Sequence, residues 1–398
     1  KLLLQLQIVN FRKGSYLVVE GKENTDHFYI IKKGNVQCFK ASGSGLAPTI
    51  YGPGDFVGVV PCMSDHLQIE TAIASTDVMA ISVRKDQYPE LISQNTPVAL
   101  KIIKTFANRM RVMNEMLTKA TLHSVVQDTH DQIFKVANFY EKNALPDVAV
   151  FAYYQYLKTK PQGPNADFAK QKFVALKPKT HAVYFEPTAE ASRQYPKDTM
   201  IFSEAQNGSD MFIIQRGEVS ITKVVNGNEV TLAVLKKGDM FGEMALIENK
   251  PRSANAIAHS DCTLMVINRS NFNQMVATQP QLVAKLTTTL ADRLWSMYRQ
   301  LDNASLQEPL AKMLDMLSLQ LEKQRVKIGL SKVSMQTEFT PKDLANMCGL
   351  ASQYHAKAIY DFENYDQIRI ENGKVFIKDA SEVMKTAAFY RKQNNIKK

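Results

Sequence analysis

The chain carries the sequence FGEMALIENKPRSA at residues 241–254, and we expect the rest of the fold to be organised around it. Gly242 permits a tight turn, and a helical turn after it would point free N–H groups at an anion. Arg252 follows nine residues after Glu243, and its planar guanidinium suits two phosphate oxygens. Ser253 adds a hydroxyl donor, whereas the Glu243 carboxylate suits a sugar hydroxyl. The stretch therefore predicts a site for a ribose that carries a phosphate.

This stretch resembles the phosphate-binding cassette of cyclic nucleotide-binding domains, in which F-G-E-hydrophobic-A-L is followed by P-R-S-A or a close variant. The resemblance implies that Glu243 accepts a hydrogen bond from the ribose 2′-hydroxyl and that Arg252 binds the cyclic phosphate of cyclic AMP or cyclic GMP. It also implies a phosphate cradle formed by Gly242, Met244, Ala245 and Ser253. The effector would be this nucleotide, without a metal. The alternative is a surface β-loop with a structural arginine, which so many matched positions at fixed spacing disfavour.

Length and composition predict a multidomain protein without a membrane span. The chain has 398 residues and 45% hydrophobic content, from which we expect about two to four packed domains. No apolar run approaches the roughly 20 residues of a membrane helix, and no secretory signal is visible, although the chain starts at Lys1. The four cysteines are scattered without a C-x-x-C pair, so we expect reduced thiols in a cytoplasmic protein. The net charge of +10 suits a nucleic-acid partner, but most of the excess lies in the first half of the chain.

A copy of the cassette region occurs earlier in the chain. The stretch YGPGDFVG at 51–58 aligns with LKKGDMFG at 235–242, an offset of 184 residues, and AIA at 72–74 aligns with AIA at 256–258. The first copy has lost the chemistry, because Glu243, Arg252 and Ser253 are matched there by Val59, Gln68 and Ile69. Without the guanidinium, a buried phosphate has no cationic partner. We therefore expect the first copy to bind no cyclic nucleotide and to serve docking, dimerisation or regulation; a different ligand is the alternative.

The predicted fold class is an α+β multidomain chain with two antiparallel jelly-roll domains of the cyclic nucleotide-binding type. The expected order is a degenerate copy at 1–122, a helical spacer at 123–182, the competent copy at 183–270, a long helix at 271–303 and a last domain at 304–398. Helix breakers in the spacer separate predicted helices at 131–142, 146–160 and 165–176. The second of these resembles a tetratricopeptide-repeat (TPR) helix. The TPR-like spacer is therefore either a plain connector or a surface for a protein partner.

A helix predicted over residues 269–301 follows the second copy. Its leucines recur every three or four residues, which indicates a buried stripe. In the Crp/Fnr regulators, which this region resembles, this helix pairs with its twin in a homodimer and its polar positions reach the base. The resemblance places Met297 and Tyr298 at the base and pairs Arg293 with Glu243. Both base positions depart from the small hydroxyl residues of that family, which leaves the base open between cyclic AMP, the first expectation, and cyclic GMP.

The C-terminal part is predicted to form helix, turn, helix and hairpin, the order of a winged helix-turn-helix. Thr340 and Pro341 begin one helix, and Asn372-Gly373 closes the hairpin. The segment resembles the DNA-binding end of the Crp/Fnr family. This resemblance implies base contacts by Ser352, Gln353 and Lys357, and phosphate contacts by Lys374, Lys378, Arg391, Lys392, Lys397 and Lys398. Because the predicted recognition helix lacks the arginines common in that family, a partner surface without DNA binding is the alternative.

Two functions from different classes follow from these patterns. The first is a dimeric transcription regulator in which a cyclic nucleotide repositions the DNA-binding ends. The second is a cyclic nucleotide-binding scaffold or regulatory subunit that acts on a protein partner, since tandem domains of this type also occur in kinase regulatory subunits. An enzyme is not expected, because the sequence shows no nucleophile–base pair, metal-ligand set or Walker loop.

Overall fold

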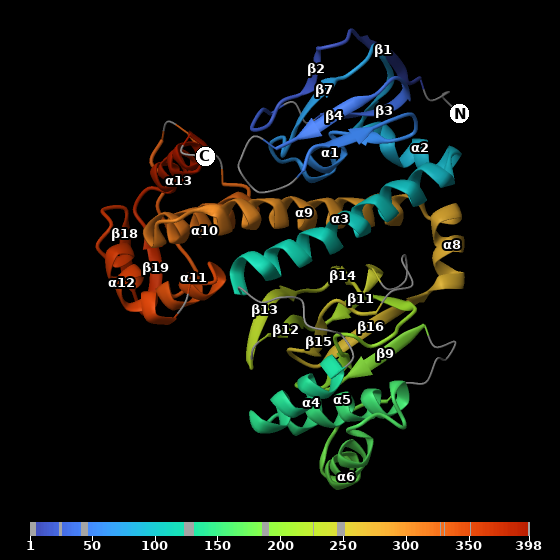
Figure 1. Cartoon of the computed structure of the whole chain (residues 1–398), viewed down its shortest axis with the longest axis vertical. Helices are drawn as coiled ribbons and strands as arrows, with labels where there is room; N and C mark the ends of the chain where they lie inside the picture. The colour runs from blue at the N-terminus through green and yellow to red at the C-terminus, as the bar shows by residue number, and fades with distance from the viewer. Residues whose placement is uncertain are drawn as a thin grey trace. The chain divides into compact units, whose positions relative to one another are not determined.

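A computed structural model of the chain (Figure 1) describes residues 5–23, 26–40, 47–122, 131–184, 191–225, 227–244, 251–326, 328–329, 331–350 and 352–396. The chain divides into two compact units. The first comprises Lys1–Leu91, Val112–Val125 and Leu290–Lys398, and the second comprises Ile92–Arg111 and Val126–Thr289. Over the described ranges, no helix combines the length and the apolar character needed to cross a membrane.

The N-terminal β-domain, in the first unit, has two four-stranded antiparallel sheets. One sheet has the order β1 (Gln7–Phe11), β8 (Val78–Arg84), β3 (His27–Lys33) and β6 (Phe56–Val57). The other has the order β2 (Tyr16–Val18), β7 (Thr71–Ala74), β4 (Val36–Phe39) and β5 (Thr49–Tyr51). Because side chains alternate along each strand, Ile31, Val36 and Ala72 meet in one buried core. A six-residue helix, α1 (Val59–Ser64), follows β6.

The second unit contains a β-domain with the same architecture. One sheet has the order β14 (Met240–Phe241), β11 (Asp210–Arg216), β16 (Cys262–Asn268) and β9 (Ser192–Tyr195). The other has the order β10 (Met200–Phe202), β15 (Asn255–Ala258), β12 (Val219–Val225) and β13 (Asn228–Leu235). The aromatic rings of Phe202, Phe212 and Phe241 pack together inside it. Both predicted β-domains are therefore present as pairs of antiparallel sheets.

The two β-domains share their strand pairing. Tyr16 pairs with Ile73 and Val18 with Ala72, with a register shift between the two pairs. The same shift occurs 184 residues later, where Met200 pairs with Ile257 and Phe202 with Ala256. The duplication that the cassettes predict is therefore reproduced in the register of the sheets.

The repeat also includes the helices that follow each β-domain; the sequence predicted a helical segment after each domain but did not show that the two segments correspond. Helices α2 (Tyr88–Gln94) and α3 (Thr96–Leu122) in the first copy correspond to α8 (Arg269–Thr278) and α9 (Pro280–Ser305) in the second. The same offset of 184 residues carries the first residue of α3 onto the first residue of α9. The chain is thus a duplication of a whole module, the β-domain together with its long helix.

The prediction of one continuous helix from residue 269 was wrong. The structure has two helices there, because α8 ends at Thr278 and α9 begins at Pro280. Gln279 between them has φ −129° and ψ 66°, outside the helical region. A proline ring disfavours the helical conformation of the residue before it and offers no N–H to a preceding turn. The predicted stripe is otherwise correct, since Leu286, Leu290 and Leu294 are fully buried.

Three helices precede the second β-domain, as predicted: α4 (Gln132–Lys142), α5 (Pro146–Thr159) and α6 (Ala166–Leu176). They share a core with that domain, because Met200 of β10 and Val224 of β12 lie in the same buried cluster as Tyr140. The Tyr140 hydroxyl also lies 2.9 Å from the Thr222 hydroxyl of β12. In the second unit these helices therefore cover one sheet face.

The C-terminal part contains the helix that the sequence predicts at 306–324 and then follows the predicted order, with one more helix at its end. Helix α10 (Pro309–Lys323) precedes α11 (Pro341–Met347) and α12 (Ser352–Glu363), and β18 (Ile368–Glu371), β19 (Lys374–Ile377) and β17 (Met335–Gln336) form a small sheet. Thr340 caps α11, because its Oγ1 accepts a hydrogen bond from the Asp343 N–H at 3.1 Å. The predicted basic tail is instead a helix, α13 (Ala380–Ile396).

Candidate functional site

The cassette begins at the end of β14, and a glycine forms its tight turn. Gly242 has φ 81°, a conformation that favours glycine. A Cβ at this position would also lie only 2.8 Å from Arg252 Nη1. Glu243 and Met244 then enter a helical conformation, as predicted. Ala245 and the rest of the predicted helical turn lie outside the described residues.

Arg252 is held in the site by its own backbone. Its N–H donates to the Gln206 carbonyl at 2.9 Å, and its carbonyl accepts from the Ala205 N–H at 2.8 Å. Its side chain is 6% exposed, and its guanidinium carbon lies 4.2 Å from the centre of the Phe202 ring. Nη1 donates to the Gly242 carbonyl at 2.8 Å. The guanidinium is therefore fixed beside the glycine turn of the cassette.

The charge of Arg252 lacks a full set of partners. Among the residues that the structure describes, its buried Nε has no hydrogen-bond acceptor. Burial lowers the pKa of Arg252 to about 10, although the nearby carboxylates of Asp210 and Glu243 oppose this shift. The side chain stays cationic at neutral pH, and its burial carries a desolvation cost that the two carboxylates offset only in part. An anionic ligand that accepts from Nε would offset that cost.

The other predicted cassette residues gather around the same point. Glu243 is buried at 3% exposure, and it contributes to the electrostatic field at Arg252. The Ser253 hydroxyl lies 3.9 Å from the Met244 sulfur. Gly242, Glu243, Met244, Arg252 and Ser253 thus form one site in the second unit, with a cation, a carboxylate and a hydroxyl. This set of groups suits a phosphorylated ribose.

The three predicted base-contacting or linking residues lie elsewhere in the chain. Arg293, Met297 and Tyr298 are on α9 beyond Thr289, in the first unit, whereas the cassette is in the second. Met297 and Tyr298 are buried. Their contact with a base, and the pairing of Arg293 with Glu243, stay predictions.

Two residues of the site were missed by sequence reasoning. Phe202 packs its ring against the guanidinium of Arg252, a cation–π contact that no motif indicates. Gly208 leaves room for that side chain, because a Cβ there would lie 2.6 Å from Arg252 Nε. Gly208 was visible only as a turn residue, and nothing in its sequence context places it beside residue 252.

The first repeat has the same frame without the charge. The Gly21 N–H donates to the Gln68 carbonyl at 2.8 Å, and the Gln68 N–H donates to the Lys22 carbonyl at 3.0 Å. These are the hydrogen bonds that Arg252 makes in the second repeat, so Gln68 occupies the place of Arg252. Its neighbour Ile69 is buried, and Glu70 stands where the second repeat has an alanine. Burial raises the pKa of Glu70 to about 7. An acid and an apolar side chain disfavour a phosphate here.

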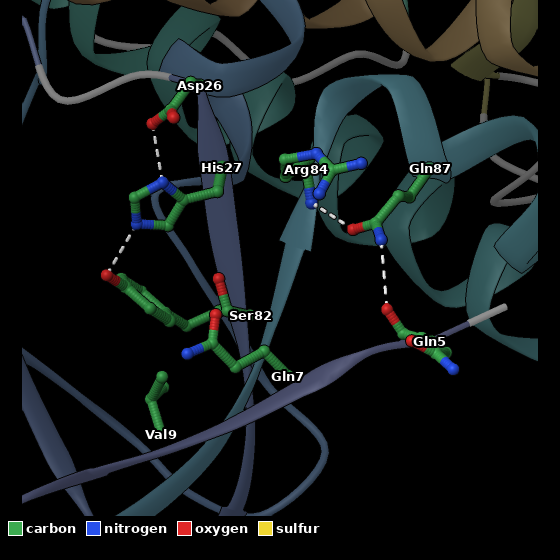
Figure 2. Close-up of a pocket in the computed structure, with 9 residues that line it drawn as sticks. Gln5, Gln7, Val9, Asp26, His27, Ser82, Arg84 and Gln87 are labelled. Carbon is green, nitrogen blue, oxygen red and sulfur yellow. Dashed lines mark hydrogen bonds and ion pairs between the residues drawn. The ribbon is translucent and has the colours of Figure 1, made fainter.

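A separate polar pocket of about 390 Å³ lies on the first repeat (Figure 2). Within it, His27 Nδ1 lies 2.6 Å from Asp26 Oδ1, and His27 Nε2 lies 2.7 Å from the Tyr29 hydroxyl. The Gln87 amide donates to the Gln5 carbonyl at 3.1 Å. The residues that line the pocket are Gln5, Gln7, Val9, Asp26, His27, Tyr29, Ser82, Arg84 and Gln87. None of them belongs to the degenerate cassette, and the main polar groups already bond to one another.

The predicted DNA-contacting residues are divided between exposed and paired side chains. Gln353 and Lys357 are exposed on α12, where Ser352 is the first residue. Tyr360 is 66% exposed, and one helical turn separates it from Lys357, so these residues share a face. Lys374 is instead ion-paired with Glu338. Sequence reasoning missed Tyr360, because an exposed aromatic residue has no periodic signature.

The prediction for Arg391 was wrong. This residue was expected to contact a DNA phosphate from a basic tail, whereas it is ion-paired with the fully buried Asp315 of α10. An arginine on an amphipathic helix can satisfy a buried acid, and the apolar residues of α13 give that helix a packed face. Lys397 and Lys398 lie outside the described residues.

Comparison with known proteins identifies the repeated module. The family described as "Cyclic nucleotide-binding domain" matches residues 8–95 and 192–279, so the chain contains two domains of this type and the predicted duplication is confirmed. Among the described residues, no group of three or more His, Cys, Asp or Glu side chains is arranged to hold a metal ion.

Relatives of two kinds match this chain. The cyclic AMP receptor protein of Thermus thermophilus is 27% identical over 195 residues, 48% of this chain and 84% of that protein. The cGMP-dependent protein kinase 2 of Homo sapiens is 41% identical over 91 residues, 22% of this chain and 12% of the kinase. The cAMP-dependent protein kinase regulatory subunit of Eremothecium gossypii is 22% identical over 281 residues, 71% of this chain and 46% of the subunit. Among solved structures, a CooA mutant from Carboxydothermus hydrogenoformans covers 49% of this chain and 87% of its own, with 18% identity and a TM-score of 0.41.

Proposed function

We propose that this chain is a transcription regulator that binds one cyclic nucleotide, at the second repeat, and DNA at its C-terminal part. The observation that carries the first half is the buried Arg252, which lies in one site with Glu243 and Ser253. Its Nε has no hydrogen-bond acceptor among the described residues. A cyclic phosphate would supply that acceptor, and the ribose 2′-hydroxyl would donate to Glu243. Cyclic AMP is the first candidate, with cyclic GMP as the alternative. The relatives that bear cyclic AMP in their names support this order.

The DNA-binding half of the proposal rests on α11, α12 and the β18–β19 hairpin as a winged helix-turn-helix. Helix α12 buries Ala358 and Phe362 and exposes Gln353, Lys357 and Tyr360 on the opposite face. A glutamine amide can read adenine, and a lysine can reach guanine or a phosphate.

Regulation of a protein partner is the second candidate. An apolar groove between α5 and α6 supports it, since the groove is lined by Tyr154, Leu157, Phe173 and Val174 with Lys158 at its edge. The exposed Tyr360 on α12 is equally suited to a protein surface. The kinase regulatory subunit that matches 71% of the chain belongs to this functional class.

Titration calorimetry of the full chain with cyclic AMP and with cyclic GMP tests the ligand. We expect one site per chain, because the first repeat presents Gln68 and Glu70 where the second presents Arg252 and an alanine. The nucleotide with the lower Kd identifies the base. Two sites per chain would show that the first repeat binds after all, and no heat with either nucleotide would exclude the ligand.

Selection of DNA from a random pool, with and without the nucleotide, tests the C-terminal part. We expect an enriched sequence in the bound state, and Lys357→Ala should weaken binding to it by about tenfold. The matched control is Lys385→Ala, an exposed lysine on α13 outside the predicted DNA face, which should change the affinity by less than about twofold. A pool without enrichment in either state would favour the protein-partner function.

A further inference from the structure

The C-terminal half of α9 makes specific contacts with the first repeat, and both belong to the first unit. The Trp295 ring stacks on His66 with ring centres 3.6 Å apart and 13° between the planes. Asp292 Oδ1 lies 3.4 Å from His66 Nε2. Asp302 Oδ2 lies 2.9 Å from Lys40 Nζ, and the side chains of this pair are 10% and 4% exposed. Trp295 and the Lys40–Asp302 pair are largely buried, so removal of one partner of this pair would leave the other charge buried and unpaired.

The contact surface on the first repeat includes the degenerate cassette. Arg325, beyond α10, donates from Nη1 to the Ser64 carbonyl at 2.7 Å and pairs with Asp292 at 3.3 Å. Ser64 ends α1, the helix that replaces the phosphate-binding turn, and His66 lies two residues before Gln68. The segment that has lost its nucleotide chemistry thus bonds to α9 and to the segment after α10.

The second repeat has a lysine–glutamate pair at the position of Lys40, and this pair also contacts a helix. Its Lys223 pairs with Glu204 at 3.4 Å, as Lys40 pairs with Glu20 at 3.2 Å in the first repeat. Glu204 also accepts a hydrogen bond at 3.2 Å from Gln132 of α4. Each repeat therefore has a lysine–glutamate pair that receives a polar side chain from a docked helix. That helix is α4 in the second repeat and α9 in the first.

The apolar face of α9 is already covered within a single chain. Leu290 and Leu294 have no exposed surface, and Leu301 and Trp295 are nearly as buried. A helix that waited for a second chain would expose such a stripe in the isolated chain. The duplication gives a structural reason for this cover, since the chain carries two copies of the whole module and so contains a second β-domain that can pack against α9.

We propose that the first repeat is the docking domain for α9 of its own chain. It takes the role that a second chain would have in the predicted homodimer. Its partner surface is the acidic and aromatic stripe Asp292, Trp295 and Asp302, which Lys40 and His66 receive. In place of a nucleotide, the degenerate repeat binds the helix that leads into the C-terminal part. This inference does not depend on ligand binding or on DNA binding.

Hydrogen–deuterium exchange of the full chain without ligand tests the proposal. In the wild type, we expect amides 290–305 to be protected equally at two protein concentrations that differ by about 100-fold, because intrachain contacts are independent of concentration. The double variant Lys40→Met/His66→Ala should exchange these amides about tenfold faster. The matched control is Lys33→Met, which removes an exposed lysine of the same repeat and should leave exchange unchanged.

Two results would overturn the proposal. If the protection of amides 290–305 falls on dilution, the apolar face of α9 is covered by a second chain. Protection that is unchanged in the double variant would show that Lys40 and His66 do not hold α9. The reciprocal variant Asp302→Asn keeps the test valid if the double variant unfolds, because it removes the same ion pair from the helix side and should also speed exchange. Exchange at Thr71–Ala74, in the core of the first repeat, reports whether each variant is folded.

Discussion

Replacement of Arg252 by glutamine is expected to weaken cyclic nucleotide binding by at least about 100-fold. The guanidinium would make two charge-assisted hydrogen bonds to the cyclic phosphate, each worth about 1.5–3 kcal/mol. Glutamine is the informative substitution, because the first repeat has Gln68 at this position in the same backbone frame. The variant therefore converts the second site to the chemistry of the first. Titration calorimetry of the full chain measures the loss directly.

The same substitution should leave the free protein at least as stable as the wild type. Burial of Arg252 with no acceptor for Nε among the described residues costs free energy in the absence of ligand, and a neutral amide removes that cost. We expect the free energy of unfolding of the ligand-free variant to be equal or slightly higher. Lower affinity with retained stability distinguishes a binding residue from a structural one. The matched control is Gln68→Leu in the first repeat, which should leave the affinity for the nucleotide unchanged. An Arg252→Gln variant that binds within about threefold of the wild type would contradict the site.

The cassette was predictable because its chemistry is local in sequence. Gly242, Glu243, Arg252 and Ser253 lie within one stretch, and each has a residue type that few alternatives can replace. Phe202 and Gly208 reach the same site from other parts of the β-domain. Only the pairing of distant strands brings them together, and a phenylalanine or glycine in a β-pattern has many ordinary explanations. The sequence therefore predicted the cassette residues that the structure brings together and missed the residues that position them.

The long helices show a different limit. Apolar spacing predicted the buried stripe of α9 but not the beginning of the helix, because the first leucine of the stripe is Leu282, after the break at Gln279. The same spacing did not reveal that α3 is the repeat of α9, since helical surfaces share a period without sharing residues. Arg391 was misplaced for a related reason. Its partner Asp315 lies 76 positions earlier, and a basic residue near the end of a chain is read most simply as a solvated tail.

Replacement of Asp315 by asparagine is expected to have the largest effect on the stability of the first unit. Asp315 is fully buried, and its Oδ1 lies 3.2 Å from Arg299 Nη2. Arg391 pairs with the same carboxylate, and Asn303 donates to Oδ2 at 3.0 Å. Asparagine leaves two arginines with half of their counter-charge in a buried site. Removal of one partner of such a network costs about 3–5 kcal/mol, so the chain should unfold at a clearly lower urea concentration.

The fluorescence of Trp295 is a suitable measurement, because it is the only tryptophan of the chain and lies in the same unit as Asp315. The matched control is Glu382→Gln, which breaks a pair with Lys385 whose two side chains are about half exposed. That change should cost less than about 1 kcal/mol. If Asp315→Asn unfolds within that margin of the wild type, the network does not stabilise the unit.

The dependence on pH gives an independent check of the same network. Burial alone would raise the pKa of Asp315, but Arg299 and Arg391 hold it below its usual range. A carboxyl whose pKa is lower in the folded state contributes stability above its unfolded pKa of about 4, and that contribution is lost as the pH falls further. The wild type should therefore lose stability more steeply than Asp315→Asn below about pH 4. The two unfolding curves should converge on acidification, because protonation removes in the wild type the charge that the variant already lacks. Parallel curves would mean that the carboxylate titrates as it does in the unfolded chain, and the coupling between α9, α10 and α13 would then have to come from packing alone.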